Sequence, residues 1–234
     1  MSSVNNADYK YELVDATLKL CQVHMASPLL IAHEKLFSSG KLAHYPYLKS
    51  ELKTFAIPAG HYSFSLDNVF LNKCPMRLII CFLDAEAISG SYAKNPFNFQ
   101  HKNLNYLALE LDGEPIPAKN MTVTMNTSAL DSNFLDAMMP MFRSQGDMYS
   151  PAGVATGITR SDFVGGYALF VFDLEAEIQQ SPNSAETYFP KEKSGNLRVE
   201  SRFEKALDTT TNMLLYATFP GQFSVDQQRN IFIQ

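Results

Sequence analysis

The sequence predicts a mostly β fold, an antiparallel β-sandwich of jelly-roll type with one or two short helical insertions. Three observations point to it. Many short strand-like segments follow one another, separated by turn residues. Helical segments do not alternate with these strands, as a parallel α/β sheet would require. The number of strands and the long loops suit two facing sheets, although strand number alone does not separate a jelly roll from an immunoglobulin-like sandwich.

The N-terminal region predicts one long strand followed by a helix. Polar and apolar residues alternate from Tyr9 to Met25, and the apolar face switches near Asp15 as a bulge would permit. Ser27-Pro28 then fits an N-cap with a first-turn proline, and Ser39-Gly40 fits a helix end. We therefore expect a helix of about a dozen residues between them.

The rest of the chain reads as further strands. Met76 to Asp84 is a continuous apolar run, typical of a strand buried on both faces. Asp112-Gly113 is a hairpin signal, and Pro115 and Pro117 place the returning strand at an edge or in imperfect pairing. The expected strands cover residues 45–57, 62–66, 76–84, 104–111, 114–124, 167–174, 197–203, 213–219 and 231–233.

Two segments interrupt the strands. Phe134 to Phe142 predicts a short helix in which Met138 and Met141 face the core and Met139 faces outward. Ser144 to Gly166 predicts a long loop, and loops of this length usually form part of an interface or a site rim. No linker or repeat divides the chain, so residues 1–234 are expected to form a single jelly-roll domain.

Composition excludes several classes of function. Nineteen basic against 24 acidic residues leave a net charge of −5, which provides no electrostatic footprint for nucleic acid. Three cysteines cannot build a disulfide framework. The sequence shows neither a signal peptide nor an apolar run long enough to span a membrane.

No constellation of residues predicts catalysis, and neither a metal nor a cofactor is expected. Cys21 and His24 would point to opposite faces of a strand, so Cys21 is expected to be a small buried thiol. His101 lies in a polar loop, and Asp84 with Glu86 is expected to be a solvated strand end. Phosphate loops, dinucleotide fingerprints and nucleophile elbows are absent from the sequence.

Several blocks of sequence resemble, in order, the C-terminal half of a large family of uncharacterised open reading frames in invertebrate genomes. The family is associated with Polinton/Maverick or adintovirus-like elements, and its longer members look like double jelly-roll major capsid proteins. The matching blocks are Lys73-Cys-Pro-Met-Arg-Leu-Ile-Ile, Gly90-Ser-Tyr-Ala-Lys-Asn-Pro-Phe-Asn-Phe-Gln-His, Leu107-Ala-Leu-Glu-Leu-Asp-Gly-Glu-Pro-Ile-Pro-Ala-Lys, Gly166-Tyr-Ala-Leu-Phe-Val-Phe-Asp-Leu, Gly195-Asn-Leu-Arg-Val-Glu-Ser-Arg-Phe and Tyr216-Ala-Thr-Phe with Arg229-Asn-Ile.

The resemblance implies a structural virion protein, the second jelly roll of a longer major capsid protein. Its partners would be further copies of itself, as a trimeric capsomer in the full-length form, and other capsid proteins, without direct contact to nucleic acid or membrane. Its location would be the virion, after assembly inside the host cell. We expect candidate subunit contacts at Tyr92, Asn95, Phe97, Phe99, Met139 and Tyr149.

A different class of function stays open at this point. Jelly rolls also host ligand- and carbohydrate-binding sites, for which Tyr92 and Phe97 would supply an aromatic platform and Asn95 and Asn98 would supply amide hydrogen bonds.

Overall fold

The computed structural model describes residue 10 and residues 12–125, 133–143, 157–174 and 193–233. The chain forms two compact units. The larger unit is Leu48–Pro220, and the smaller unit combines Ser2–Tyr47 with Gly221–Gln234. The two longest strands, β1 (Ala43–Ile57) and β11 (Thr211–Val225), contribute residues to both units.

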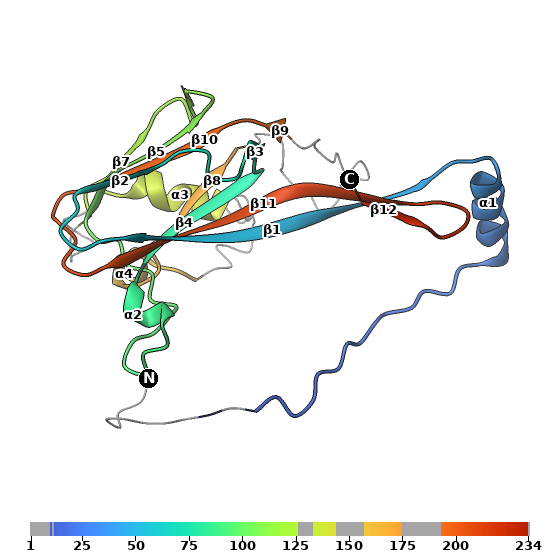
Figure 1. The fold of residues 1–234 in the computed structure, drawn as a ribbon, viewed down its shortest axis with the longest axis horizontal. Coiled ribbons are helices and arrows are strands. Elements are labelled where there is room, and N and C mark those ends of the chain that lie inside the picture. Colours follow the sequence, from blue (N-terminus) through green and yellow to red (C-terminus); the bar gives the residue numbers. More distant parts are fainter. Residues whose placement is uncertain (1–9, 11, 126–132, 144–156, 175–192, 234) are drawn as a thin grey trace. The chain divides into compact units, whose positions relative to one another are not determined.

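The larger unit contains two antiparallel sheets, which we call sheet A and sheet B (Figure 1). Sheet A has the order β1-β11-β4-β8, with β4 at Arg77–Asp84 and β8 at Phe170–Asp173. Sheet B has the order β2-β10-β5-β6, and β7 also pairs with β5. Its strands are β2 (Ser63–Leu66), β10 (Leu197–Phe203), β5 (Leu104–Leu111), β6 (Glu114–Pro115) and β7 (Met121–Thr122). A short ladder joins β3 (Lys73–Cys74) to β9 (Lys193–Ser194).

The strand pairs are nested in a way that defines the jelly roll. The outermost pair is β1 with β11, inside it β2 pairs with β10, then β4 pairs with β8, and the innermost hairpin is β5 with β6. One long hairpin rolled up on itself produces this order. In an immunoglobulin-like sandwich the first strand would instead pair with the second. The fold predicted from the sequence is therefore confirmed, and the immunoglobulin alternative is excluded.

The two sheets share one apolar core. The register of β4 with β11 places Phe82 opposite Met213 and Ile80 opposite Leu215, and all four side chains are buried. The Phe82 ring meets Phe203 of sheet B edge to face, with 5.4 Å between ring centroids. Burial of such aromatic side chains supplies a large part of the driving force for folding.

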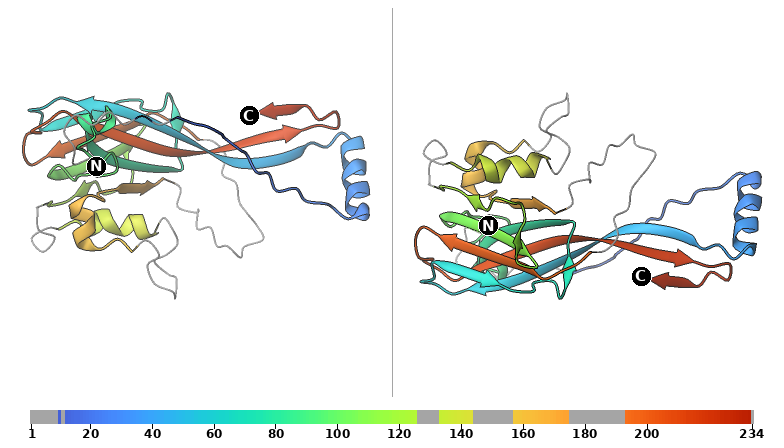
Figure 2. Two further views of the ribbon diagram at one scale, coloured as in Figure 1. Left: turned by 90° about the horizontal axis from the view of Figure 1, so that it is seen from below. Right: turned by 90° about the horizontal axis from the view of Figure 1, so that it is seen from above.

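In the described part of the larger unit the helices are α2 (Ala85–Ile88), α3 (Leu135–Arg143) and α4 (Arg160–Gly165). Figure 2 shows α3 and α4 side by side next to β8. The rings of Phe134, just before α3, and Phe163 in α4 stack at 5.1 Å. The α4 helix was not expected, because this segment reads as loop. A capping box between Thr159 and Asp162 starts the helix.

The predicted hairpin and its irregular return are confirmed. Asp112 and Gly113 adopt φ values of 52° and 87°, as a tight turn between paired strands requires. The return breaks into β6 and β7, separated by a cis Ile116-Pro117 bond. Prolines that cannot donate to the ladder explain this division.

The smaller unit differs from the prediction at its start. Residues 12–26 form neither a strand nor a helix, so the long strand expected from Tyr9 to Met25 is wrong for this part of the chain. The periodicity was present, but no neighbouring strand pairs with the segment, and an unpaired strand is not stable. The helix α1 (Ser27–Ser38) has the expected length, although Ala26 rather than Ser27 is its N-cap.

Strand ends complete the smaller unit. The strand β12 (Ile231–Ile233) forms as the apolar sequence predicted, and it pairs with the end of β11. Tyr45 of β1 stacks on Phe223 of β11 at 4.9 Å. His44 Nδ1 lies 2.9 Å from the Ser224 hydroxyl, which is fully buried.

Candidate subunit-contact surfaces

The loop of residues 89–103 is tied to the sandwich through the carboxylate of Asp84. This group, at the end of β4, accepts hydrogen bonds from Lys102, from Lys94 at 3.3 Å and from Thr209 at 3.1 Å. Lys94 also pairs with Glu86 at 2.8 Å. Burial by itself raises the pKa of Asp84, but hydrogen bonds and charges, first from Lys102, outweigh burial and hold the pKa below its usual value.

This network corrects the interpretation of Asp84 as a solvated strand end. The Asp84 side chain is only 17% exposed. It holds the loop of residues 89–103, which follows α2. Glu86 is 73% exposed, as expected. The sequence carried no signal for the cluster, because Lys94, Lys102 and Thr209 come from distant positions.

Most of the predicted contact residues lie in the loop that Asp84 holds. Phe97 is 72% exposed and Tyr92 is 46% exposed. The Asn95 side-chain oxygen accepts the Phe97 N–H at 3.0 Å, so it shapes the turn that presents the ring. These positions suit contacts with another subunit, which stays a prediction.

Phe99 lies deeper than a surface contact would. Its side chain is half-buried, its N–H donates to the Gly166 carbonyl at 2.8 Å and its carbonyl accepts from Ala168 at 3.1 Å. The backbone of Phe99 thus fastens the loop to the segment before β8. Tyr149, predicted with it, lies outside the described residues.

The methionines of α3, Met138, Met139 and Met141, divide between core and surface. Met138 and Met141 are buried and Met139 is 39% exposed, as helical spacing predicted. Leu135, in the same helix, is 47% exposed. Met139 is the exposed methionine of this group and stays a candidate contact.

The cysteines and His101 show no activated group. Cys81 is buried, which raises the pKa of its thiol to about 12. Cys21 is exposed, contrary to the expectation of a buried thiol, because the strand that would have buried it does not form. Burial, then the charge of Lys102, lowers the pKa of His101, whose Nδ1 accepts the Asn103 N–H at 3.0 Å.

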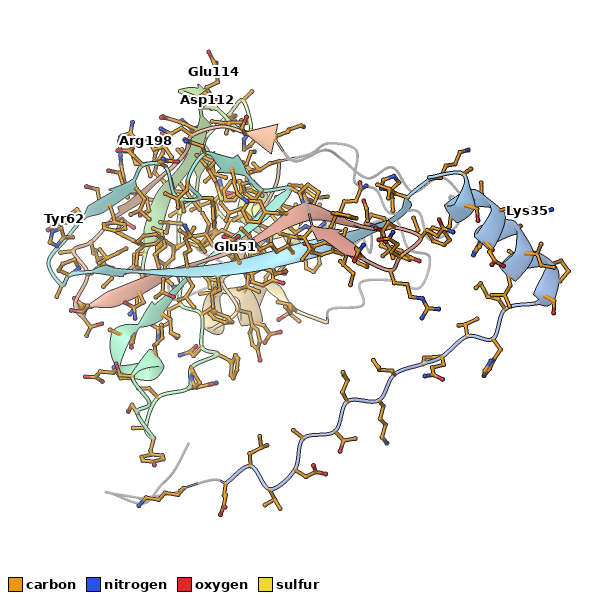
Figure 3. All side chains as sticks on the ribbon, turned by 45° about the vertical axis from the view of Figure 1, so that its right-hand side comes forward. Lys35, Glu51, Tyr62, Asp112, Glu114 and Arg198 are labelled. Atoms are coloured by element: carbon orange, nitrogen blue, oxygen red, sulfur yellow. The ribbon has the colours of Figure 1, made fainter. Side chains whose placement is uncertain are left out.

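The smaller unit exposes most of its apolar side chains. None of the apolar residues described in residues 10–47 and 221–233 is buried, and α1 has no buried residue. Figure 3 labels Lys35 on this helix. The large apolar residues that are exposed here are Leu13, Val14, Leu18, Leu20, Val23, Met25, Leu29, Leu30, Ile31, Leu36, Leu42, Tyr45, Ile231, Phe232 and Ile233. Exposed apolar side chains in this number are typical of interaction surfaces.

The outer face of sheet B is charged, and its arginines pair with nearby carboxylates, although the buried Nε of Arg198 makes no hydrogen bond. Arg198 is paired with Glu110 at 3.5 Å and with Asp67 at 3.3 Å, and Figure 3 marks Arg198 on this sheet. Arg202 pairs with Glu200 at 2.7 Å and lies over the Tyr106 ring at 4.7 Å. Burying these ion pairs against a partner would carry a desolvation cost.

The outer face of sheet A is instead apolar around β1 and β11. The register places Tyr216 opposite Ile79 and Leu214 opposite Cys81. The Tyr216 hydroxyl donates to Ser50 of β1 at 2.8 Å, so Ser50 shares this outer face with Leu48 and Leu52. Leu48 is 49% exposed and Leu52 is 61% exposed. The signal in the sequence was the alternation of Leu48, Ser50 and Leu52 with charged residues, which the strand assignment alone left unused.

Among the described residues, no group of three His, Cys, Asp or Glu side chains is arranged to hold a metal ion. In the same part of the chain, no helix has both the length and the apolar character needed to cross a membrane.

The nested strand order makes this chain a jelly-roll protein, and comparisons with known proteins add its relatives. It is 25% identical over 228 residues to an uncharacterised protein of Caenorhabditis elegans, and the match covers 95% of this chain. The chain spans about half the length of that relative, 51%. No family model matches the sequence.

Two solved structures are similar at the level of backbone comparison. One is the structure of the Sputnik virophage, at 14% identity and a TM-score of 0.45, covering 82% of this chain and 39% of that one. The other is the mavirus major capsid protein, at 11% identity and a TM-score of 0.38, covering 83% of this chain and 41% of that one.

Proposed function

We propose that this protein is a structural virion protein, a jelly-roll module of a major capsid protein from a DNA virus or virus-like transposon. It acts by associating with further copies of itself and with other capsid proteins. As part of this proposal, residues 1–234 form one jelly roll that corresponds to the second of two in longer relatives, and the protein resides in the virion. It is not an enzyme.

One observation carries the proposal: a complete jelly roll with a closed core is joined to a unit whose described apolar side chains all remain outside any core. A free monomer gains nothing from exposing residues such as Leu18, Ile31 and Phe232 to water. Transfer of such side chains out of water is worth about 1.5–3 kcal/mol each. Burial between subunits recovers that free energy, which is how a capsid protein works.

The sequence blocks that resemble the Polinton/Maverick family support the same proposal, because most of them include strands of the sandwich. The block that starts at Leu107 covers the end of β5, and the block from Gly166 to Leu174 contains β8. The matching length of about half of the C. elegans relative agrees with a module of a longer chain.

The alternative, a carbohydrate-binding jelly roll, would use Tyr92, Asn95 and Phe97. Phe97 is well exposed, but the Asn95 oxygen is already engaged within the loop. If the protein bound glycans on an array and the Phe97→Ala variant did not, this result would favour the carbohydrate-binding alternative over the capsid role.

Self-association of the full chain is the decisive experiment. Light scattering and sedimentation velocity, over a hundredfold range of protein concentration, should show mass rising with concentration. Ile31→Asp and Phe232→Asp should reduce this rise in mass. Lys35→Asp, on the same helix as Ile31, serves as the matched control. A monomer at every concentration would overturn the proposal.

A further inference from the structure

The strand β1 leaves one edge of sheet A open. It is the terminal strand at one end of the order β1-β11-β4-β8, so one side of its backbone faces away from the sheet. At 15 residues it is a long edge, and long edges are templates for pairing with another strand. At the opposite end of the sheet, α3 packs against β8. Among the described residues, no further strand pairs with the outer side of β1, so this is the open edge of sheet A.

We infer that β1 pairs antiparallel with β1 of a second copy, about a two-fold axis that passes through Ser50. The inference rests on the proposed self-association and names one contact surface through which it occurs. In this register residue 48 faces residue 52 of the second copy, and residue 49 faces residue 51. The two sheets A become one continuous sheet. Figure 3 marks Glu51 on the strand.

The outer face of β1 is complementary to itself in this register. Leu48 comes to lie opposite Leu52 of the second copy, and Leu52 opposite its Leu48. Both leucines are exposed, at 49% and 61%. Tyr216 is 42% exposed beside them and holds Ser50 at the axis by its hydrogen bond. Direct cross-strand neighbours lie about 4.5–5.5 Å apart at Cβ, so the two leucine pairs bury one another.

The opposite face of the strand carries complementary charges. Lys49 comes to lie opposite Glu51 of the second copy, and the symmetric contact repeats it. Within one chain these residues already pair, with 2.8 Å between Lys49 Nζ and Glu51 Oε1. The hydrogen bond from Lys49 lowers the pKa of Glu51, so the carboxylate is ionised near neutral pH. The same two residues can therefore bridge both within and between strands.

Neighbouring registers are disfavoured by charge. A shift by two residues in one direction brings Lys49 opposite its own copy, and a shift in the other brings Glu51 opposite its own copy. Like charges directly opposite are destabilising. Shifts by one residue place leucines opposite charged residues, because direct partners share a face of the sheet. Pro46 lacks an N–H and ends the stretch that can pair.

The β1 edge of a second copy fits this edge better than the outer face of sheet B of a neighbouring molecule does. The exposed face of sheet B carries satisfied ion pairs such as Arg202 with Glu200, which gain nothing against an apolar surface. The edge of β1 offers backbone groups, two leucines and one opposite-charge pair in a self-complementary order. This is the composition of an isologous contact.

Cysteine cross-linking tests the axis directly. In the full chain with Cys21→Ser, which removes the exposed native thiol, Ser50→Cys places two thiols opposite each other at disulfide distance. Thr54→Cys is the matched control on the same exposed face. In the inferred register its thiols lie about 26 Å apart. We expect at least tenfold faster disulfide dimer formation for Ser50→Cys, and equal rates for both variants would overturn the inference.

A charge exchange tests the register. Lys49→Glu should weaken dimerisation by about tenfold or more, because it places two acidic residues opposite each other at two symmetric positions. Lys49→Glu with Glu51→Lys should restore it. Lys119→Glu, at an 82% exposed side chain outside the edge, is the control for net charge. Restoration that fails while the double variant keeps its thermal stability would overturn the inference.

The two proposals fail differently. If the full chain is monomeric at every concentration, the proposed function and the β1 contact fall together. If the chain associates but neither Ser50→Cys nor the charge exchange affects association, the β1 contact falls and association uses another surface.

Discussion

Lys102 donates a hydrogen bond to Asp84, and this contact joins the loop of residues 89–103 to the end of β4. The side chains are only 15% and 17% exposed, so water screens the pair weakly. The loop that carries Phe97 and Tyr92 is thus held by an ion pair rather than by an apolar core. Presentation of these rings to a partner depends on a group that no local sequence pattern identifies.

Replacing this carboxylate should destabilise the larger unit. Asp84→Asn leaves Lys102 and Lys94 without their shared anion, at an expected cost of about 2 kcal/mol in the free energy of unfolding. Urea denaturation followed by circular dichroism measures it. Asp136→Asn, at a side chain 71% exposed and 4.0 Å from Lys119, should cost less than about 0.5 kcal/mol. Equal effects of the two variants would contradict the role given to Asp84.

The pKa of Asp84, lowered in the folded state, also predicts how stability responds to acid. The unfolded chain binds the proton more readily, so the contribution of Asp84 is present above its unfolded-state pKa, about 3.9, and is lost as pH falls through the lower folded-state pKa. Chemical denaturation between pH 6 and pH 3 should show a shallower loss of stability in Asp84→Asn than in the wild type. An unchanged slope would contradict the assignment.

His101 predicts a second pH dependence at milder acidity. Burial and Lys102 lower its pKa in the folded state, so the unfolded chain takes up the proton first as pH falls below about 6.5. Stability contributed by neutral His101 is therefore present above that pH and is lost below it. His101→Gln should flatten the stability profile between pH 7 and pH 5, as chemical denaturation at a series of pH values measures; an unchanged profile would contradict the role given to His101.

The three cysteines should separate into one reactive and two protected thiols. Cys21 is exposed, whereas Cys74 and Cys81 are buried, and the pKa of Cys81 rises to about 12. A maleimide reagent at pH 7 should modify Cys21 alone in the native protein and all three cysteines in denaturant, as intact-mass spectrometry resolves. Native modification of Cys81 at the rate of Cys21 would contradict its burial.

Two phenylalanines should report on fold and contact separately. Phe82 is fully buried between Phe170 and Phe203, so Phe82→Ala should cost about 3–5 kcal/mol of stability. Phe97 is 72% exposed, so Phe97→Ala should leave the melting temperature nearly unchanged and reduce self-association. Scanning calorimetry and sedimentation distinguish the outcomes. A large loss of stability in Phe97→Ala would show that this ring is structural.

Local patterns identified most of the sandwich. The apolar run before Asp84, the strand-like segment Leu104–Leu111 and the Asp112-Gly113 turn each specify an element through neighbouring residues, and β4, β5 and the hairpin of β5 with β6 form as predicted. The same reasoning failed where a strand depends on pairing with a distant segment of the chain. Residues 12–26 have strand periodicity without a strand, and Cys21 is exposed as a result.

The sequence by itself determined most strands of the sandwich, the hairpin and the outward position of Met139, because each depends on residues close together along it. Only the tertiary structure decided that β1 closes against β11, that Asp84 gathers Lys94, Lys102 and Thr209, and that β1 lies at an open edge. These relationships join residues far apart in sequence. Their free energy comes from pairing and burial in the folded sheet, which periodicity along one segment does not encode.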